Sequence, residues 1–179
     1  MDRFLAIDAA FSQKFVLPLG SDWRRLARLV AHLGDGPIVF GGLAIIYLLR
    51  RFWQNSFLYQ VDLSILLIVL TAMMVVTLIK FIVRRERPAP PGEFVTFQYD
   101  AYSFPSGHAA RMAALAVSIA FFFPSFSLAM AAVALGVAIA RVAVGIHFIS
   151  DIVVGLAVGA IVAWADIQIL EYLLSLPTS

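Results

Sequence analysis

Long apolar blocks separated by short polar connections make up most of the chain after residue 36. A helix needs about 20 predominantly apolar residues to cross a bilayer, so each block is a candidate transmembrane helix. We place these helices at residues 37–49, 57–83, 108–123, 126–145 and 149–174. The first is short, and would need flanking residues or local thinning of the membrane. The pattern therefore predicts an all-α fold, an integral membrane helical bundle with about five transmembrane helices.

The N-terminal segment, residues 1–33, has a different pattern, because large apolar side chains interleave with charged ones. This mixture is typical of amphipathic helices that lie in the membrane interface. We expect one or two of them, with Ser21 as the N-cap of the second. A turn should follow at residues 34–37, which read Gly-Asp-Gly-Pro. We expect Asp35 to shape that turn and His32 to be structural.

The chain reads as a single domain, residues 1–179, in which residues 34–174 form the transmembrane bundle. The longest polar section, residues 84–107, is rich in proline and should be a loop with little regular structure. Small residues in the later blocks, among them Gly155 and Gly159, should let the helices pack closely.

Composition narrows the possible functions. Hydrophobic residues make up 62% of the chain and the mean hydropathy is +0.94, whereas a soluble domain is about half apolar. The absence of cysteine excludes disulfides and thiolate metal sites. The net charge of +2 is modest, and nothing suggests nucleic-acid binding. Membrane lipids are the expected surroundings, and the oligomeric state is left open.

The orientation in the membrane is ambiguous from the sequence. If residues 1–33 do not cross, the long loop and the turn at His147 emerge on one side, and the connection near residues 50–55 lies opposite. Arg50 and Arg51 favour a cytoplasmic position for that connection, whereas the arginines of residues 24–28 argue the reverse. We favour the orientation that puts the long loop at the extracytoplasmic face of a plasma membrane or bacterial inner membrane.

Charged residues, which are unfavourable inside a membrane, lie at the ends of several predicted spans. A charge near the bilayer centre costs about 2.5–3.5 kcal/mol on insertion scales, so such residues usually mark a functional site. By the topology above, all of them fall on the same face of the membrane. They are Lys80, Arg87, His108, Arg111, Arg141, His147 and Asp151. A cluster this cationic repels itself unless an anion binds, and a phosphate suits forked arginine donors and a point-charge lysine.

Local spacings agree with a phosphate site. Ser106 can cap a helix whose free N–H groups, with Gly107 allowing close approach, would bind an anion. His147 and Asp151 are four residues apart, so the carboxylate can accept from one imidazole nitrogen and leave the other to react. Lys80, Arg84 and Arg87 would share one face if their helix continued beyond residue 83.

The three motifs in this cluster resemble those of the type 2 phosphatidic acid phosphatase superfamily, which also includes glucose-6-phosphatase and the vanadium haloperoxidases. The family motifs are, in order, Lys-x6-Arg-Pro, Pro-Ser-Gly-His and Ser-Arg-x5-His-x3-Asp. This chain has Lys80 to Arg87-Pro88, then Pro105-Ser106-Gly107-His108, then Arg141 to His147 and Asp151. The resemblance covers roughly residues 34–165. Two departures are Ala140 where the family usually has serine, and five predicted spans where most membrane members have six.

The resemblance implies a metal-independent and cofactor-free mechanism. His147 would attack phosphorus and form a phosphohistidine, while Asp151 orients it. His108 would protonate the leaving group and then activate water. Lys80, Arg87, Ser106, Gly107 and Arg141 would hold the phosphate oxygens, and residues 84–107 would be the catalytic loop. Arg111 lies outside the motifs, and we expect with equal weight that it contacts a headgroup or pairs with an acid.

Three functions fit these observations. The first is a lipid phosphatase that hydrolyses the phosphomonoester of a phosphatidic acid, phosphatidylglycerol phosphate or lipid A type of substrate. The second is a phosphatase of undecaprenyl or another polyprenyl diphosphate, in which phosphate is the leaving group. The third, from another class, is a protein that binds or transports anionic lipids without hydrolysis. The combination of His108, His147 and Asp151 argues against the third, and the membrane spans argue against a haloperoxidase.

Overall fold

The structure, a computed structural model, describes residues 2–53, 56–88 and 102–175, and every regular element in these ranges is helical. The α-helices are α1 (Asp2–Gln13), α2 (Asp22–His32), α3 (Gly36–Trp53), α4 (Ser56–Val83), α5 (Gly107–Phe122), α6 (Ser127–Ala143) and α7 (Ile149–Ser175), with the short 3-10 helix η2 (Pro124–Phe126) between α5 and α6. The predicted all-α fold is confirmed. Part of the predicted catalytic loop, residues 89–101, lies outside the described residues.

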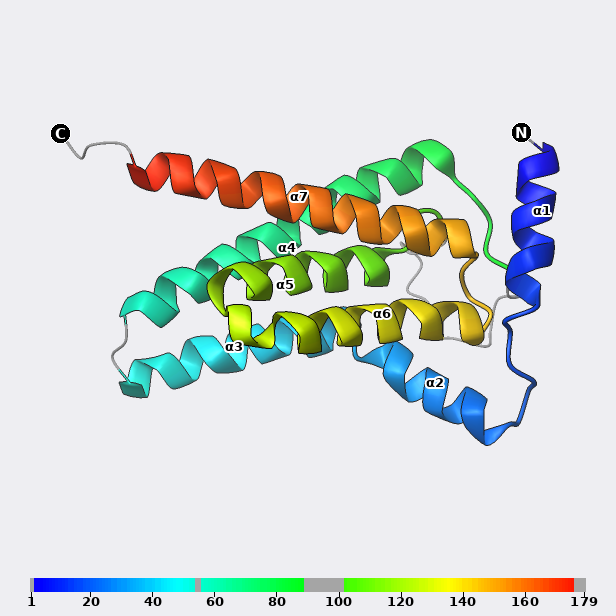
Figure 1. Cartoon of the computed structure of the whole chain (residues 1–179), viewed down its shortest axis with the longest axis horizontal. Coiled ribbons are helices and arrows are strands. Elements are labelled where there is room, and N and C mark those ends of the chain that lie inside the picture. The colour runs from blue at the N-terminus through cyan, green and yellow to red at the C-terminus, as the bar shows by residue number, and fades with distance from the viewer. Residues whose placement is uncertain (1, 54–55, 89–101, 176–179) are drawn as a thin grey trace.

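The five apolar blocks of the sequence correspond to α3 to α7 (Figure 1). Three stretches in the described residues are long and apolar enough to cross a bilayer alone: Gln60–Val83, Pro124–Ala143 and Ile149–Leu173. A fourth candidate is α2 together with α3, which are bent by 48° at their junction, and α5 is a shorter apolar helix. The integral membrane bundle is therefore confirmed, while five remains an approximate count of its spans.

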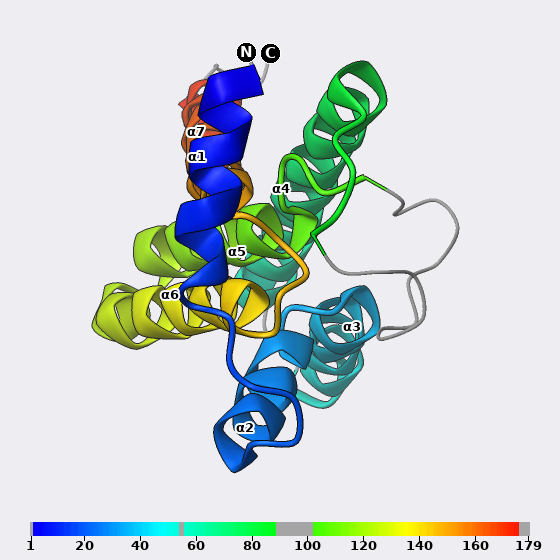
Figure 2. The ribbon, with the colours of Figure 1, turned by 90° about the vertical axis from the view of Figure 1, so that its right-hand side faces the viewer.

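Helix α5 lies at the centre of the bundle, against α4, α6 and α7 (Figure 2). Two glycines of α7 permit the closest approach. A Cβ atom on Gly155 would lie 2.6 Å from the Ser106 carbonyl oxygen, and one on Gly159 would lie 2.1 Å from the Ala110 carbonyl oxygen. Since real Cβ atoms do not come this near to backbone, glycine at both positions lets α7 pack backbone to backbone on α5, as the sequence predicts.

Two helices form the N-terminal segment, and they pack at the same end of the bundle. Helix α1 runs across the first turn of α7 rather than along it (Figure 1), and α2 packs on α6. Ser21 caps α2 as predicted, because its hydroxyl accepts from the Arg24 N–H at 3.2 Å. The buried Arg24 guanidinium then donates to the carbonyl oxygens of Leu17 (2.7 Å) and Val144 (2.9 Å), which fastens the N-terminal segment to the bundle.

Candidate active site

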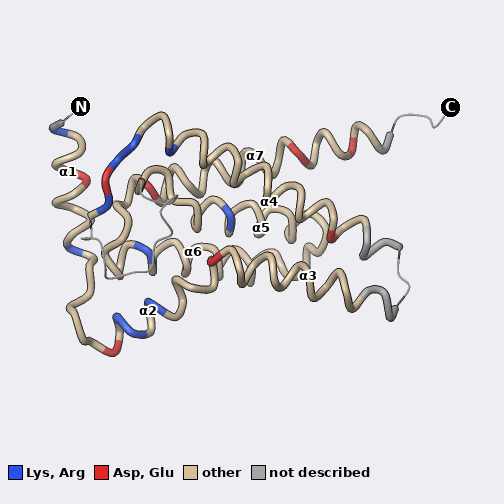
Figure 3. The backbone as a smooth tube through the Cα atoms, turned by 180° about the vertical axis from the view of Figure 1, so that it is seen from behind, with Lys and Arg blue, Asp and Glu red and all other residues tan. Residues whose placement is uncertain are grey.

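The basic residues gather toward the end of the bundle that carries α1 (Figure 3). Six pieces of chain supply the predicted site there: the end of α4, the two described ends of the long loop, the start of α5, the end of α6 and the turn into α7. The site residues therefore come from segments up to 71 positions apart, Lys80 to Asp151. Only the folded bundle brings them together.

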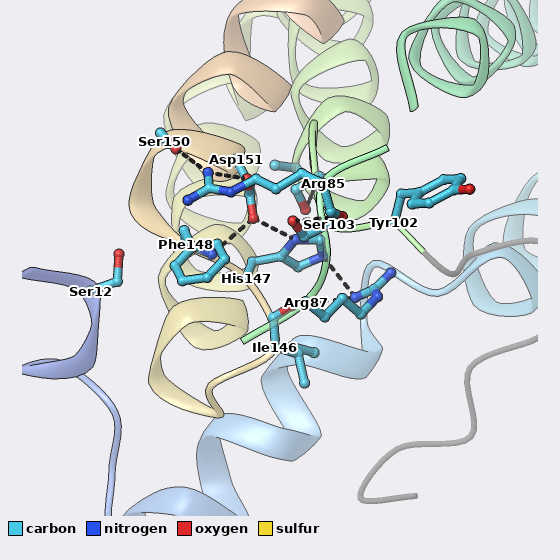
Figure 4. Close-up of polar contacts among 12 residues, drawn as sticks. Ser12, Arg85, Arg87, Tyr102, Ser103, Ile146, His147, Phe148, Ser150 and Asp151 are labelled. Atoms are coloured by element: carbon cyan, nitrogen blue, oxygen red, sulfur yellow. Dashed lines mark hydrogen bonds and ion pairs between the residues drawn. The ribbon is translucent and has the colours of Figure 1, made fainter. Parts of the chain in front are cut away.

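His147 lies in the turn between α6 and α7, and its two ring nitrogens have different partners (Figure 4). Nδ1 is 3.4 Å from Oδ2 of Asp151, in the first turn of α7. Nε2 is 3.4 Å from Nη1 of Arg87. The carboxylate is fully buried and also accepts from the Phe148 N–H at 2.9 Å. One nitrogen is thus held by an acid while the other faces the Arg87 guanidinium, an arrangement that would suit a nucleophile.

Burial lowers the pKa of His147 well below 6.5, and the positive charges of Arg141, Arg87 and Lys80 lower it further. Both causes disfavour the imidazolium. His147 is therefore neutral at physiological pH, which is the form whose lone pair can attack phosphorus.

The predicted cations Lys80 and Arg87 both face the turn and the loop. The Lys80 ammonium is buried and donates to the Tyr102 carbonyl oxygen at 2.6 Å, which ties α4 to the end of the loop. Arg87 donates from Nη1 to the Ile146 carbonyl oxygen at 3.3 Å, next to its contact with His147. Arg141 is buried in the last turn of α6 and acts electrostatically on both histidines.

Ser106 caps α5 as predicted. Its hydroxyl accepts from the Ala109 N–H at 3.4 Å, and its own N–H donates to the Asp151 carbonyl oxygen at 2.9 Å. The cap therefore joins the start of α5 to the start of α7. Gly107 follows with no side chain, and a Cβ there would meet the Lys80 side chain at 4.0 Å. The start of α5 therefore lies beside the Lys80 side chain of the cationic cluster.

His108 has a carboxylate partner that the sequence interpretation did not assign to it. Its Nε2 is 2.6 Å from Oδ1 of Asp35, and Oδ2 of the same carboxylate is 2.7 Å from Nδ1 of His32. Burial alone would raise the pKa of the Asp35 carboxyl, but the hydrogen bonds from both imidazoles outweigh it and lower the pKa to about 2. Asp35 also shapes its turn as expected, because its carbonyl oxygen accepts from the N–H groups of Ile38 and Val39.

Gly34 explains how the turn comes so near the site. A Cβ atom at this position would lie 2.8 Å from Val137 and 3.2 Å from the His108 ring. The only sequence signal for the Asp35 contact was the glycine-rich turn itself. Arg111, one helical turn beyond His108, is buried and donates to the Gly34 carbonyl oxygen at 2.6 Å. Arg111 therefore supports the turn that carries Asp35, and its contact with a headgroup stays a prediction.

The expectation for Arg84 was wrong. Helix α4 ends at Val83, and Arg84 has a left-handed backbone with φ 51°, so the helix does not carry Arg84 and Arg87 onto the face of Lys80. Arg84 is exposed and donates to the Phe81 carbonyl oxygen. The change of backbone direction at Arg84 places Arg85 inside the site instead, where it donates to Asp151 (Figure 4).

Ala140, the departure from the third motif, does not face the cluster. It lies in an apolar group with Ala27 and Ala31 of α2 and with Val144 and Ile146. An alanine here contributes to the packing of α2 on α6, so its missing hydroxyl leaves no gap among the cations of the cluster.

Comparison with known proteins decides the family. The model of the PAP2 superfamily matches residues 62–174, well over half of the chain. The chain belongs to the PAP2 superfamily. All three motifs that carry the resemblance lie inside the matched region.

Among curated proteins, this PAP2 chain is similar to two enzymes named lipid A 1-phosphatase. It is 34% identical to that of Rhizobium johnstonii over 90 residues, which is 46% of this chain and 37% of the relative. For Rhizobium etli the identity is 34% over 89 residues, 46% of this chain and 38% of the relative. The matched stretch is thus little more than a third of the relatives' length.

Two solved structures share the fold. A PAP2-type phosphatidylglycerolphosphate phosphatase from Bacillus subtilis superposes with a TM-score of 0.78 over 96% of this chain and 88% of that chain, at 23% identity. Aquifex aeolicus LpxE superposes with a TM-score of 0.70 over 89% of this chain and 93% of that chain, at 20% identity. The superpositions establish that α1 to α7 follow the fold of membrane phosphatases.

Proposed function

We propose that this PAP2 protein is a membrane-embedded lipid phosphatase that hydrolyses the phosphomonoester of a lipid phosphate through a phosphohistidine at His147. The observation that carries the proposal is the pair of contacts on that imidazole, Asp151 at Nδ1 and Arg87 at Nε2. A neutral imidazole held by an acid, among cations, is built to attack an anionic phosphorus centre.

In the first step, Nε2 of His147 forms a bond to phosphorus while the bond from phosphorus to the lipid oxygen breaks. His108 gives a proton to that leaving oxygen. Because Asp35 holds its Nε2, Nδ1 is the nitrogen left to face the substrate. In the second step, His108 takes a proton from water, the water oxygen bonds to phosphorus, and the phosphorus–nitrogen bond breaks. Inorganic phosphate leaves, and both histidines return to their starting states.

Phosphate monoester hydrolysis is among the slowest uncatalysed reactions, with enzymatic accelerations reaching about 10²¹-fold. Charge stabilisation and positioning must supply most of this, and an acid such as His108 adds about 10²–10⁴-fold. In the proposed site, Lys80, Arg87 and Arg141 supply the charge. The N–H groups at Ser106 and Gly107 add donors of fixed direction. Since such a site repels Mg²⁺, the proposed reaction is independent of metal ions.

The similarity to two lipid A 1-phosphatases supports a lipid that presents a phosphomonoester at the membrane surface. The proposed location is a plasma or bacterial inner membrane, with the site at the extracytoplasmic face. The basic residues lie at the end of the bundle beside α1 (Figure 3). This position suits a phosphate at the level of the lipid headgroups.

The test is phosphate release by the purified protein in detergent or vesicles. The panel comprises lipid A, phosphatidylglycerol phosphate, phosphatidic acid and undecaprenyl diphosphate, each with and without EDTA. We expect EDTA-insensitive release from at least one monoester, and an acid-labile phosphohistidine when the lipid phosphate is radiolabelled. A strong preference for the diphosphate would favour the polyprenyl reaction. No release and no label on the protein from any lipid would favour binding without hydrolysis.

A further inference from the structure

Arg85 joins the catalytic aspartate to the N-terminal helix. Its Nη1 donates to Oδ1 of Asp151 at 2.9 Å and to the Ser150 hydroxyl at 2.7 Å. Its Nη2 donates to Oδ2 of Asp8, on α1, at 2.7 Å. The guanidinium also lies over the Phe148 ring, 3.9 Å from the ring centroid. The planar fork thus bridges two carboxylates that are 143 positions apart in the sequence.

Helix α1 also caps the start of α7. The carboxylate of Asp8 accepts from the N–H and the hydroxyl of Ser150, and the Ser12 hydroxyl accepts from the Ile149 N–H at 2.9 Å. Ser12 in turn donates to Asp8 at 3.4 Å. Asp8, Ser12 and Arg85 are all nearly buried, with Arg85 only 10% exposed. Burial alone would raise the pKa of the Asp8 carboxyl, but hydrogen bonds from Ser150 and Arg85 outweigh it and lower the pKa.

We propose that Arg85, held in place by Asp8, positions Asp151 and through it the nucleophile His147, so that helix α1 is part of the catalytic apparatus. Both residues are positioning residues, since they reach the reaction only through Asp151. The proposal rests on the proposed function, because it presupposes that His147 attacks phosphate.

The charges explain why both partners are needed. The Asp151 carboxylate is fully buried, and its Oδ2 must stay directed at His147. A second donor on Oδ1 restricts rotation of the carboxylate and stabilises its negative charge. Arg85 alone would add one more cation to a site that already contains several. Asp8 offsets that charge, so the bridge supports Asp151 without adding to the repulsion around the phosphate.

A second face of α1, beside the one that carries Asp8 and Ser12, is apolar. Phe4, Ile7 and Phe11 are each at least half exposed and follow helical spacing, and Phe15, just beyond the helix, is also exposed. Because α1 runs across the first turn of α7, this face lies at the level of the bundle end that carries the site. A helix in that position buries its apolar face in the headgroup region of the membrane. The same helix would therefore contact the lipid surface with Phe4, Ile7 and Phe11 and hold Arg85 with Asp8.

The experiment compares Arg85→Ala, Arg85→Lys and Asp8→Asn with the full-length wild type in lipid phosphate hydrolysis. For Arg85→Ala we expect kcat to fall by about 10–100-fold, the loss typical when a side chain that orients a functional residue is removed. The KM should stay within about twofold of wild type. Arg85→Lys should recover only part of the loss, since an ammonium cannot fork between two carboxylates. Asp8→Asn should lower kcat in the same direction but by less.

Adding guanidinium ion to Arg85→Ala distinguishes a loss of Asp151 positioning from a loss of folding. At millimolar concentration it should restore part of kcat to Arg85→Ala, because it can occupy the space left between Asp8 and Asp151. The matched control is Arg25→Ala, which removes an arginine from an exposed ion pair with Asp22. This variant should keep wild-type kcat and should not respond to guanidinium.

Full kcat in Asp8→Asn or Arg85→Ala, beside an active wild type, would overturn this inference and leave the proposed function standing. A loss in Arg85→Ala that guanidinium does not reverse, with KM and thermal stability changed alongside kcat, would also overturn it. If Arg85→Ala does not fold, Asp8→Asn decides by the same split between kcat and KM. An inactive wild type would instead remove the proposed function.

Discussion

Replacing Asp35 by Asn tests how His108 delivers its proton. The carboxylate lies 2.6 Å from Nε2 of His108 and 2.7 Å from Nδ1 of His32 and is about one-third exposed, so the substitution changes these two contacts without leaving a cavity. A hydrogen bond to a charged group contributes about 1.5–3 kcal/mol. Each 1.36 kcal/mol corresponds to about a tenfold change in rate. Loss of this hydrogen bond in the transition state should therefore lower kcat by about tenfold to 150-fold.

Comparing two leaving groups shows whether the contact with Asp35 acts through proton donation by His108. A lipid phosphate leaves as an alkoxide and needs a proton, whereas 4-nitrophenyl phosphate leaves as a stable phenolate and does not. We expect Asp35→Asn to slow the lipid substrate strongly and the nitrophenyl ester little. Asp22→Asn, an exposed acid on α2, is the matched control and should change neither rate. Equal losses on both substrates would refute the assignment of Asp35 to the proton-donating step.

Three further predictions concern the nucleophile and its surroundings. His147→Ala should abolish phosphate release and protein labelling while the far-ultraviolet circular dichroism spectrum stays unchanged; full activity would refute the assigned nucleophile. Arg141→Lys should lower kcat by about 10²–10³-fold, since a point charge cannot replace a buried fork, and near-normal steady-state kinetics would show that Arg141 is peripheral. Since the pKa of His147 is lowered, the neutral nucleophile persists as pH falls below 6.5. The acid limb of phosphohistidine formation, measured by rapid quench, should therefore lie below pH 6.5, and a limb centred above it would contradict the pKa argument.

The fold was largely predictable because its signals are local. Each apolar block is continuous, and the structure turns the five predicted blocks into α3 to α7. The cap at Ser21 and the close approach at Gly155 and Gly159 follow from residue types whose geometry depends on immediate neighbours. The bend between α2 and α3 was not predicted as part of a span, since neither helix alone has the length to show it.

The residues that position the histidines could not be predicted. Asp35 lies 73 positions from His108, and Asp8 lies 77 positions from Arg85. An acid within an amphipathic helix or a turn has the same sequence appearance whether it faces water or a buried cation. Arg85 was missed for a more local reason. The choice between Arg84 and Arg85 depends on the left-handed residue that follows α4, and two adjacent arginines give no sign of where the helix stops.

The two histidines of the proposed site differ in their carboxylate partners and in their exposure. His147 is fully buried, contacts Asp151 and lies among cations. His108 is slightly more exposed, and its Nε2 contacts Asp35. Here each environment is set by a different piece of the N-terminal region, the turn after α2 for His108 and helix α1, through Arg85, for His147. The N-terminal 35 residues, which carry none of the family motifs, would therefore determine how well the motif residues work.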